Sequence, residues 1–122
     1  MVDIAMHIHG EEEQFINLGQ GVKRKILSYG GNMLISIMYV DKTARTKVYH
    51  KHSNEQMIYM LEGSWRLTCA GKEYLLEAGD SFYVESNVEH GAIEVVEDSV
   101  FIEVFTPVKE DLLKLKTEML EK

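Results

Sequence analysis

Residues 50–65, HKHSNEQMIYMLEGSW, carry the strongest structural signal in this chain. This stretch begins with two histidines one residue apart, His50 and His52, and continues into an apolar run. Residues two apart in a strand point to the same side, so both imidazoles can face one metal ion. If the strand continues, the same alternation turns Gln56 inward and Glu55 outward. We therefore predict that two imidazoles and one amide share a face.

A second stretch, GDSFYVESNVEH at residues 79–90, ends in another histidine. A glycine turn, a short apolar strand and a polar loop precede His90, which places its imidazole on a separate strand. His7 and His9 have the same spacing as the first pair, but they lie in a polar leader without a strand around them. We interpret these two as surface residues.

The predicted site is one divalent metal ion held by His50, His52, Gln56 and His90. All four groups are neutral, so the ion would keep its full charge and polarise substrate oxygens strongly. Imidazole and amide ligands suit zinc, nickel, manganese and iron alike, which leaves the metal open. The alternative is an exposed basic loop without a metal.

Short apolar runs separated by turn residues predict the strands. They are residues 24–29, 33–40, 57–61, 65–69, 73–76, 81–84, 92–96 and 100–105. Their regular spacing predicts an all-β barrel or sandwich. Gly71 can supply the positive φ that a tight hairpin needs. The run at 33–40 is apolar on both faces, which suits a wall covered outside by a sheet, a helix or a second subunit.

The chain after its one proline predicts a short C-terminal α-helix at about 107–121. Thr106 is the expected N-cap and Pro107 the expected first helical residue. The apolar positions make the helix amphipathic; they are Leu112, Leu113, Leu115, Met119 and Leu120. The alternative is a frayed tail. With a barrel core at about 20–106, residues 1–122 are predicted to be one domain.

Composition narrows the functional classes. The chain has 122 residues and a formal net charge of −7, which disfavours a nucleic-acid partner. Its single cysteine, Cys69, allows no internal disulfide. No apolar stretch resembles a signal peptide or a membrane span, so we expect a cytoplasmic protein without membrane contact. We also expect a homodimer, formed through a covered barrel face or by adding the N-terminal strand to a partner's sheet.

The two histidine stretches resemble the two motifs of the cupin family. His50, His52, Gln56 and Gly63 match the first motif, and residues 79–90 match the second. The resemblance covers about residues 20–112 and implies a small cupin, a double-stranded β-helix or jelly-roll barrel. Second motifs usually have a proline and a glycine where this chain has Glu85 and Asn87. Asparagine tolerates a left-handed backbone, so the turn can survive, although the loop should be looser.

A narrower resemblance connects residues 21–33, 50–56 and 97–113 to cupins of the pectin-degradation KdgF type. That family converts cyclic 4,5-unsaturated monouronates from pectin and alginate to linear keto-acids, with three histidines and a glutamine on its metal. Its further site residues correspond here to Glu103, Phe105 and Lys109. The family usually has aspartate and arginine where this chain has glutamate and lysine, and lysine cannot grip a carboxylate bidentately.

The resemblance implies an enzyme acting on a small sugar acid. Glu103 would be the general acid or base, Phe105 would pack on the sugar ring, and Lys109 with Arg24 would hold the substrate carboxylate. The alternatives are that Glu103 faces solvent, that Phe105 is plain core and that Lys109 is solvated. At the level of function, the alternatives are another metal-dependent enzyme, such as a dioxygenase, or a small-molecule-binding protein without turnover.

Overall fold

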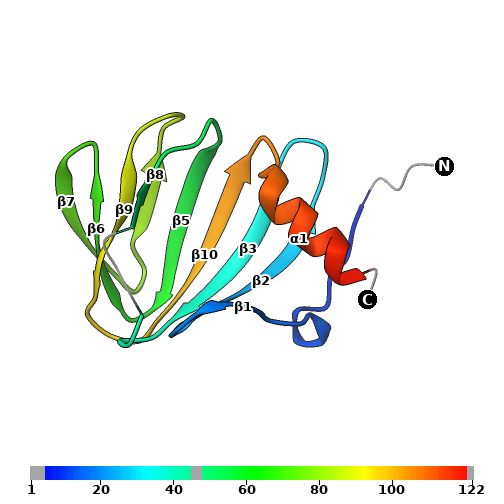
Figure 1. The fold of residues 1–122 in the computed structure, drawn as a ribbon, viewed down its shortest axis with the longest axis horizontal. Helices are drawn as coiled ribbons and strands as arrows, with labels where there is room; N and C mark the ends of the chain where they lie inside the picture. The colour runs from blue at the N-terminus through cyan, green and yellow to red at the C-terminus, as the bar shows by residue number, and fades with distance from the viewer. Residues whose placement is uncertain (1–4, 45–47, 121–122) are drawn as a thin grey trace.

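Two antiparallel sheets face each other in the computed structural model, which describes residues 5–44 and 48–120 (Figure 1). The larger sheet has the order β1 (Ile16–Gly19), β2 (Val22–Tyr29), β3 (Leu34–Val40), β10 (Ser99–Thr106), β5 (Glu55–Glu62) and β8 (Ser81–Val84). The smaller sheet has the order β4 (Val48–His50), β9 (His90–Val95), β6 (Ser64–Cys69) and β7 (Lys72–Glu77). A 3-10 turn η1 (Gly10–Glu12) precedes the sheets and a helix α1 (Glu110–Leu120) follows them. The predicted all-β jelly roll with a C-terminal helix is confirmed.

Alternation along the strands builds the core between the sheets. On β10 every second residue is buried, and on β5 the buried positions are Gln56, Ile58 and Met60. The main apolar cluster joins residues from both sheets; it includes Met38, Ile58, Met60, Leu67, Leu76 and Phe101. Because side chains of a strand point alternately to opposite faces, each run buries one row and leaves the other outside.

A second apolar cluster lies where α1 covers the larger sheet. Leu112 and Val108 pack there with Ile26, Leu34 and Phe105 of β2, β3 and β10. In Figure 1, α1 crosses in front of this end of the sheet. The helix therefore encloses inner-face residues that the narrower four-stranded sheet does not reach.

Every run predicted as a strand is a strand in the structure, with ends shifted by a few residues. The strands β1 and β4, which are only 4 and 3 residues long, were not predicted. Segments this short carry too few alternations to be recognised from sequence.

The start of the helix was predicted wrongly. Thr106 is the last residue of β10 and pairs with Glu55 of β5, so it does not cap a helix. The strand pairing continues past the expected N-cap, and α1 begins only at Glu110. The predicted final residue, 121, lies outside the described residues.

Two turn predictions are confirmed by the backbone. Gly71 has a φ of +80° in the β6–β7 hairpin, and Asn87 has a φ of +62° in the loop before β9. Asparagine thus adopts the left-handed conformation in the turn that precedes His90.

Candidate metal centre

His50 and His90 are placed together by strand pairing. They are directly opposite each other on β4 and β9, and their ring centroids lie 4.4 Å apart. Residues opposite each other on antiparallel strands project to the same face, so both rings point into the barrel. His90 is buried, whereas His50 keeps an exposed edge at the cavity mouth.

His52 and Gln56 reach the same place by a different route from the one predicted. β4 ends at His50 and β5 begins at Glu55, so the link between them crosses from one sheet to the other rather than continuing one strand. The predicted inward position of Gln56 is nevertheless confirmed, because its exposed fraction is 4% while Glu55 is exposed.

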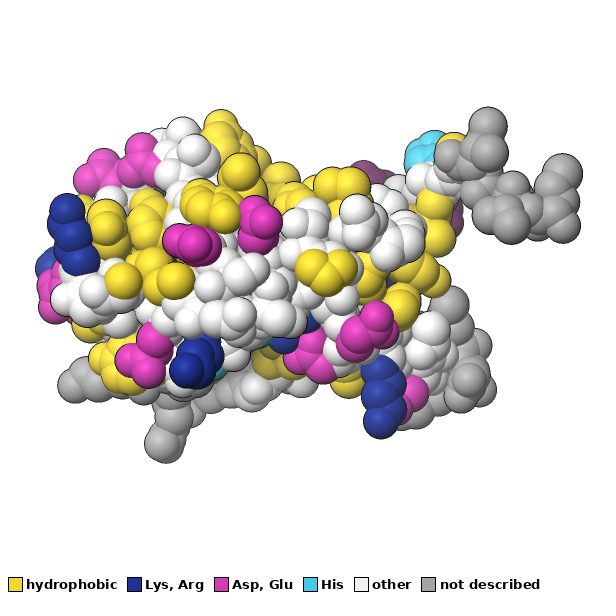
Figure 2. Space-filling view, turned by 90° about the horizontal axis from the view of Figure 1, so that it is seen from above, with side chains coloured by type: hydrophobic (Ala, Val, Ile, Leu, Met, Phe, Trp, Pro, Cys, Tyr) yellow, Lys and Arg dark blue, Asp and Glu magenta, His cyan; other side chains and the backbone are white. Residues whose placement is uncertain are grey.

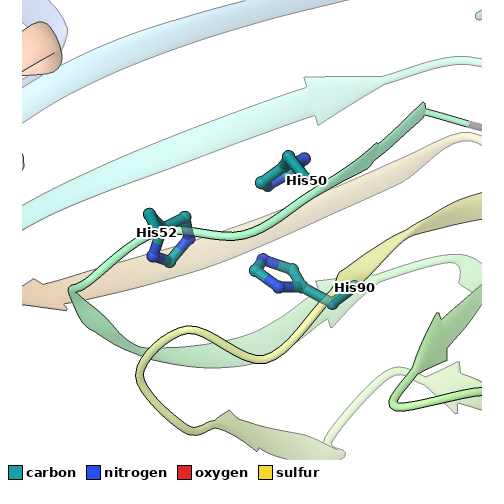
Figure 3. A group of neighbouring side chains, drawn as sticks. All are labelled: His50, His52 and His90. Atoms are coloured by element: carbon teal, nitrogen blue, oxygen red, sulfur yellow. The ribbon is translucent and has the colours of Figure 1, made fainter.

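The three rings surround one space (Figure 3). Each can offer one nitrogen, and these atoms all lie within 4.8 Å of one another. Since ions such as zinc bind imidazole at about 2.1 Å, small side-chain adjustments would bring the three nitrogens onto one ion. The three histidines can therefore hold a metal ion.

Backbone carbonyls set the tautomers of two rings. Nδ1 of His90 lies 2.9 Å from the carbonyl of Val88, and Nδ1 of His52 lies 3.0 Å from that of Asn54. A carbonyl only accepts, so in each neutral ring the proton sits on Nδ1 and the lone pair on Nε2. Nε2 of His90 is buried without a hydrogen-bond partner. A buried acceptor with its lone pair directed into the cluster fits a metal ligand.

Gln56 adds an oxygen to the cluster. Its Nε2 donates to Oε2 of Glu103, and its Oε1 lies 3.2 Å from Nε2 of His52. When His52 is neutral, two lone pairs face each other across that distance, an arrangement that a cation between them would stabilise. The donor set of three imidazoles and one amide oxygen thus fits a divalent ion.

Glu103 and Arg24 form an ion pair next to this cluster. Nη2 of Arg24 donates to Oε1 of Glu103 at 3.0 Å, and the side chains are only 12% and 8% exposed. The second carboxylate oxygen accepts from Gln56. Both oxygens of Glu103 and one guanidinium nitrogen of Arg24 are therefore engaged inside the protein.

The electrostatic environment keeps two of the imidazoles neutral. Partial desolvation, followed by the neighbouring imidazoles of His90 and His52, lowers the pKa of His50 to about 4. Desolvation also lowers the pKa of His90 below 6.5, although its hydrogen bond to Val88 acts in the opposite direction. The uncharged imidazole is the form that binds a metal, so both rings are available for one at neutral pH.

The cluster opens onto a cavity of about 610 Å³ inside the barrel. Its polar wall includes Arg24, Glu103 and Lys109, and its apolar wall includes Phe105 and Trp65. Nζ of Lys109 lies 5.8 Å from the ring centroid of Phe105 and also binds the carboxylate of Asp111. The three residues that correspond to the family's further site residues, Glu103, Phe105 and Lys109, thus line the same cavity as the histidines, and so does the candidate carboxylate-binding residue Arg24.

Two residues near the site were not singled out from the sequence. Asn54 donates from its side chain to the carbonyl of Pro107, connecting the histidine link to the segment that carries Lys109. The sequence signal that could have identified Asn54 is its even-numbered position, which it shares with the predicted inward-facing residues of this stretch. Trp65 stacks on Phe101 with ring centroids 4.6 Å apart, and nothing in its local sequence marks it as a cavity residue. His7 and His9 are exposed, as predicted.

The fold and the site agree with a known protein family. The model of the cupin domain matches residues 36–105. The chain therefore belongs to the cupin family. Within the described residues, no helix has the length and apolarity that crossing a bilayer requires.

The similar proteins include two KdgF proteins and an RmlC-like cupin. The chain is 31% identical over 104 residues to the pectin degradation protein KdgF of Dickeya dadantii, covering 84% of this chain and 94% of the relative. A solved RmlC-like cupin from Shewanella frigidimarina is also 31% identical, with a TM-score of 0.80 over 88% of this chain and 96% of that one. The structure of KdgF from Halomonas sp. has a TM-score of 0.81 at 23% identity, covering 88% and 98% of the two chains. The chain is thus a KdgF-like cupin.

Proposed function

We propose that this protein is a metal-dependent enzyme that converts cyclic 4,5-unsaturated monouronates to linear keto-acids. The observation that carries the proposal is the cluster of His50, His52, His90 and Gln56 at the cavity, in a chain similar over most of its length to KdgF. The substrate is a small sugar acid, which the cavity of about 610 Å³ can accommodate.

His50, His52, His90 and Gln56 would hold the ion, the histidines through ring nitrogens and the glutamine through its amide oxygen. When bound, it supplies Lewis-acid chemistry that stabilises negative charge on substrate oxygens. The uncharged ligands fit this role, because they leave the charge of the ion undiminished.

The substrate is oriented by Phe105 and Lys109. The Phe105 ring is 2% exposed and contacts the His52 ring edge-on at 5.8 Å between centroids, so it presents a flat apolar wall beside the cluster. The Lys109 ammonium lies above the same ring and attracts the carboxylate of a uronate. Together they would hold the sugar ring between an apolar wall and a cation.

The acid–base role predicted for Glu103 stays a prediction, as does the carboxylate-binding role of Arg24. Opening of a cyclic uronate requires proton transfers, and Glu103 is a carboxylate of the cavity wall in contact with Gln56. Each of its oxygens already accepts a hydrogen bond, one from Arg24 and one from Gln56. Each oxygen has a second lone pair, so a proton transfer at Glu103 would use a lone pair that these hydrogen bonds leave free.

The decisive experiment follows the ultraviolet band of the conjugated double bond in unsaturated galacturonate. The metal-loaded protein should remove the band, and the metal-stripped protein should not. Oxygen uptake with iron but no loss of the band would favour a dioxygenase instead. Tight binding of the uronate without turnover would favour a binding protein.

A further inference from the structure

We propose that Glu103 and Arg24 are positioning residues that fix the amide of Gln56 with its oxygen toward the metal cluster. This inference rests on the metal site of the proposed function but does not depend on the substrate. It begins from the symmetry of a glutamine amide, whose two ends have nearly the same shape and opposite polarity. Only the hydrogen-bond partners decide which end faces the histidines.

Glu103 supplies the partner that decides. An ionised carboxylate only accepts, so Oε2 of Glu103 draws the NH₂ end of Gln56 and leaves Oε1 facing His52. If the amide of Gln56 were turned over, its oxygen would face Oε2 of Glu103, which is also an acceptor. Its N–H groups would then point at the ion. Glu103 thus sets the orientation that Gln56 needs as a metal ligand. The hydrogen-bond partners of metal ligands commonly have this role.

Arg24 holds the carboxylate in turn. Its Nη2 lies 3.0 Å from Oε1 of Glu103, and its Nε points at Sδ of Met38 at 2.9 Å. The three residues form a chain from guanidinium to carboxylate to amide across the inner face of the larger sheet, from β2 past β3 to β10 and β5. Arg24 donates to one oxygen of Glu103 and Gln56 donates to the other, so the ion pair holds the carboxylate in the orientation that meets the amide.

The test exchanges the two polar groups. In the Glu103→Gln variant, the new amide offers its oxygen to Arg24 and its NH₂ group to Gln56, which then turns its own NH₂ group toward the cluster. Zinc affinity should fall about 10-fold or more, the usual effect of losing a partner of a ligand. In the Glu103→Gln, Gln56→Glu double variant, the NH₂ group at 103 again meets an acceptor at 56, and zinc affinity should recover.

Zinc affinity is measured by competition with a chromogenic chelator, with circular dichroism as the check on folding. Glu94→Gln, at an exposed position of β9, is the matched control and should bind as the native protein does. Native-like affinity in Glu103→Gln, or a double variant no better than the single one, would overturn the inference. If the single variant does not fold, the double variant is compared with Gln56→Glu, which places two carboxylates against each other and should bind more weakly. If the native protein binds no zinc, the proposed metal site itself is overturned, and this outcome is distinct from failure of the positioning inference.

A second inference comes from the opposite face of the larger sheet. We propose that this outer face is the contact between two copies of the chain. Two rows of apolar side chains cross its three central strands: Ile37, Ile102 and Tyr59 in one row, and Ile35, Val104 and Met57 in the other. An antiparallel sheet with a solvated face carries polar residues there, and large apolar patches mark contact surfaces. Figure 2 shows hydrophobic side chains gathered along one edge of the molecule.

Charges at the two sides of these rows identify the occupant. On β2, Lys23 and Lys25 pair with the outer-face positions of β3, and both ammonium groups lie within 4.5 Å of the Phe15 ring centroid. On β5, Glu55 and Glu62 are exposed at the other side. A two-fold axis parallel to the strands would place the basic side of each copy over the acidic side of the other. The face is therefore complementary to itself.

Charge reversal tests this arrangement by sedimentation velocity. The native chain should be a dimer at tens of micromolar. Two double variants reverse the charges, one with Lys23→Glu and Lys25→Glu and the other with Glu55→Lys and Glu62→Lys. Each should be monomeric by itself, because like charges then face each other. An equal mixture of the two variant chains should form a heterodimer. A monomeric native chain, or variant chains that dimerise as the native chain does, would overturn the proposal.

An apolar contrast completes the test. Ile102→Asp at the centre of the rows should give a monomer, and Leu75→Asp on β7 of the smaller sheet, where Leu75 is 46% exposed, should remain a dimer. Dimers that dissociate equally in both variants would show a contact elsewhere on the molecule and contradict the proposed face.

Discussion

The imidazoles of His50 and His90 lie 4.4 Å apart because the two residues are directly opposite each other on β4 and β9. Two residues 40 positions apart in the chain are thus held on one face by backbone hydrogen bonds before any metal binds. The cluster is therefore built into the sheet, and the ion completes it rather than creating it.

The first prediction concerns the ligands. His52→Ala should reduce zinc affinity by more than about 100-fold, beyond the range typical of losing an outer-shell partner. His9→Ala is the matched control, because His9 is exposed in the N-terminal segment and should have no effect. Chelator competition measures both. Full affinity in His52→Ala would exclude this residue from the site.

The second prediction concerns metal and stability. A ligand that binds only the folded state at 100 times its Kd stabilises that state by about 2.7 kcal/mol. For a chain of this size, the melting temperature should rise by about 10 °C when metal is added to the stripped protein. Differential scanning calorimetry measures the shift. The His52→Ala variant should show almost none, and a shift of equal size there would indicate metal binding elsewhere.

The third prediction separates backbone strain from steric clash. Gly63 has a φ of +87°, and a Cβ built on it would lie 2.2 Å from the carbonyl oxygen of Asp98. Gly71 has a similar φ of +80° but open space around it. Gly71→Ala should lower the free energy of unfolding by about 1–2 kcal/mol, the cost of the left-handed backbone.

Gly63→Ala carries the same strain and must also move the β9–β10 turn, so it should cost clearly more than Gly71→Ala. Urea denaturation of the two variants measures the difference. Equal losses would show that the Asp98 segment moves aside freely.

The fourth prediction concerns Lys109 and rests on the proposed substrate. Lys109→Met removes the cation above Phe105 and should raise KM for the uronate about 10-fold or more, as expected for a lost charged hydrogen bond. Lys109→Arg should retain most of the affinity. Lys114→Met, at an exposed position of α1, is the control. A KM unchanged in Lys109→Met would remove this residue from substrate binding.

Local hydrophobic patterns were enough to predict the architecture and the inward-facing row of the first motif. Gln56, Ile58 and Met60 alternate with exposed residues, and a period of two in hydrophobicity is enough to identify a strand and its buried side. The motif spacing likewise singled out the three histidines that the structure brings together.

The connections among the polar groups around the cluster follow from the folded arrangement of the strands and could not be predicted from local patterns. The bond between Arg24 and Glu103 joins residues 79 positions apart, and their partnership depends on strand order and register. Thr106 likewise pairs within the sheet, so the helix begins only at Glu110. The proline had locally indicated an earlier start of the helix. Local patterns record which face a side chain takes, whereas hydrogen bonds between distant strands are set by packing of the whole barrel, and no local pattern encodes them.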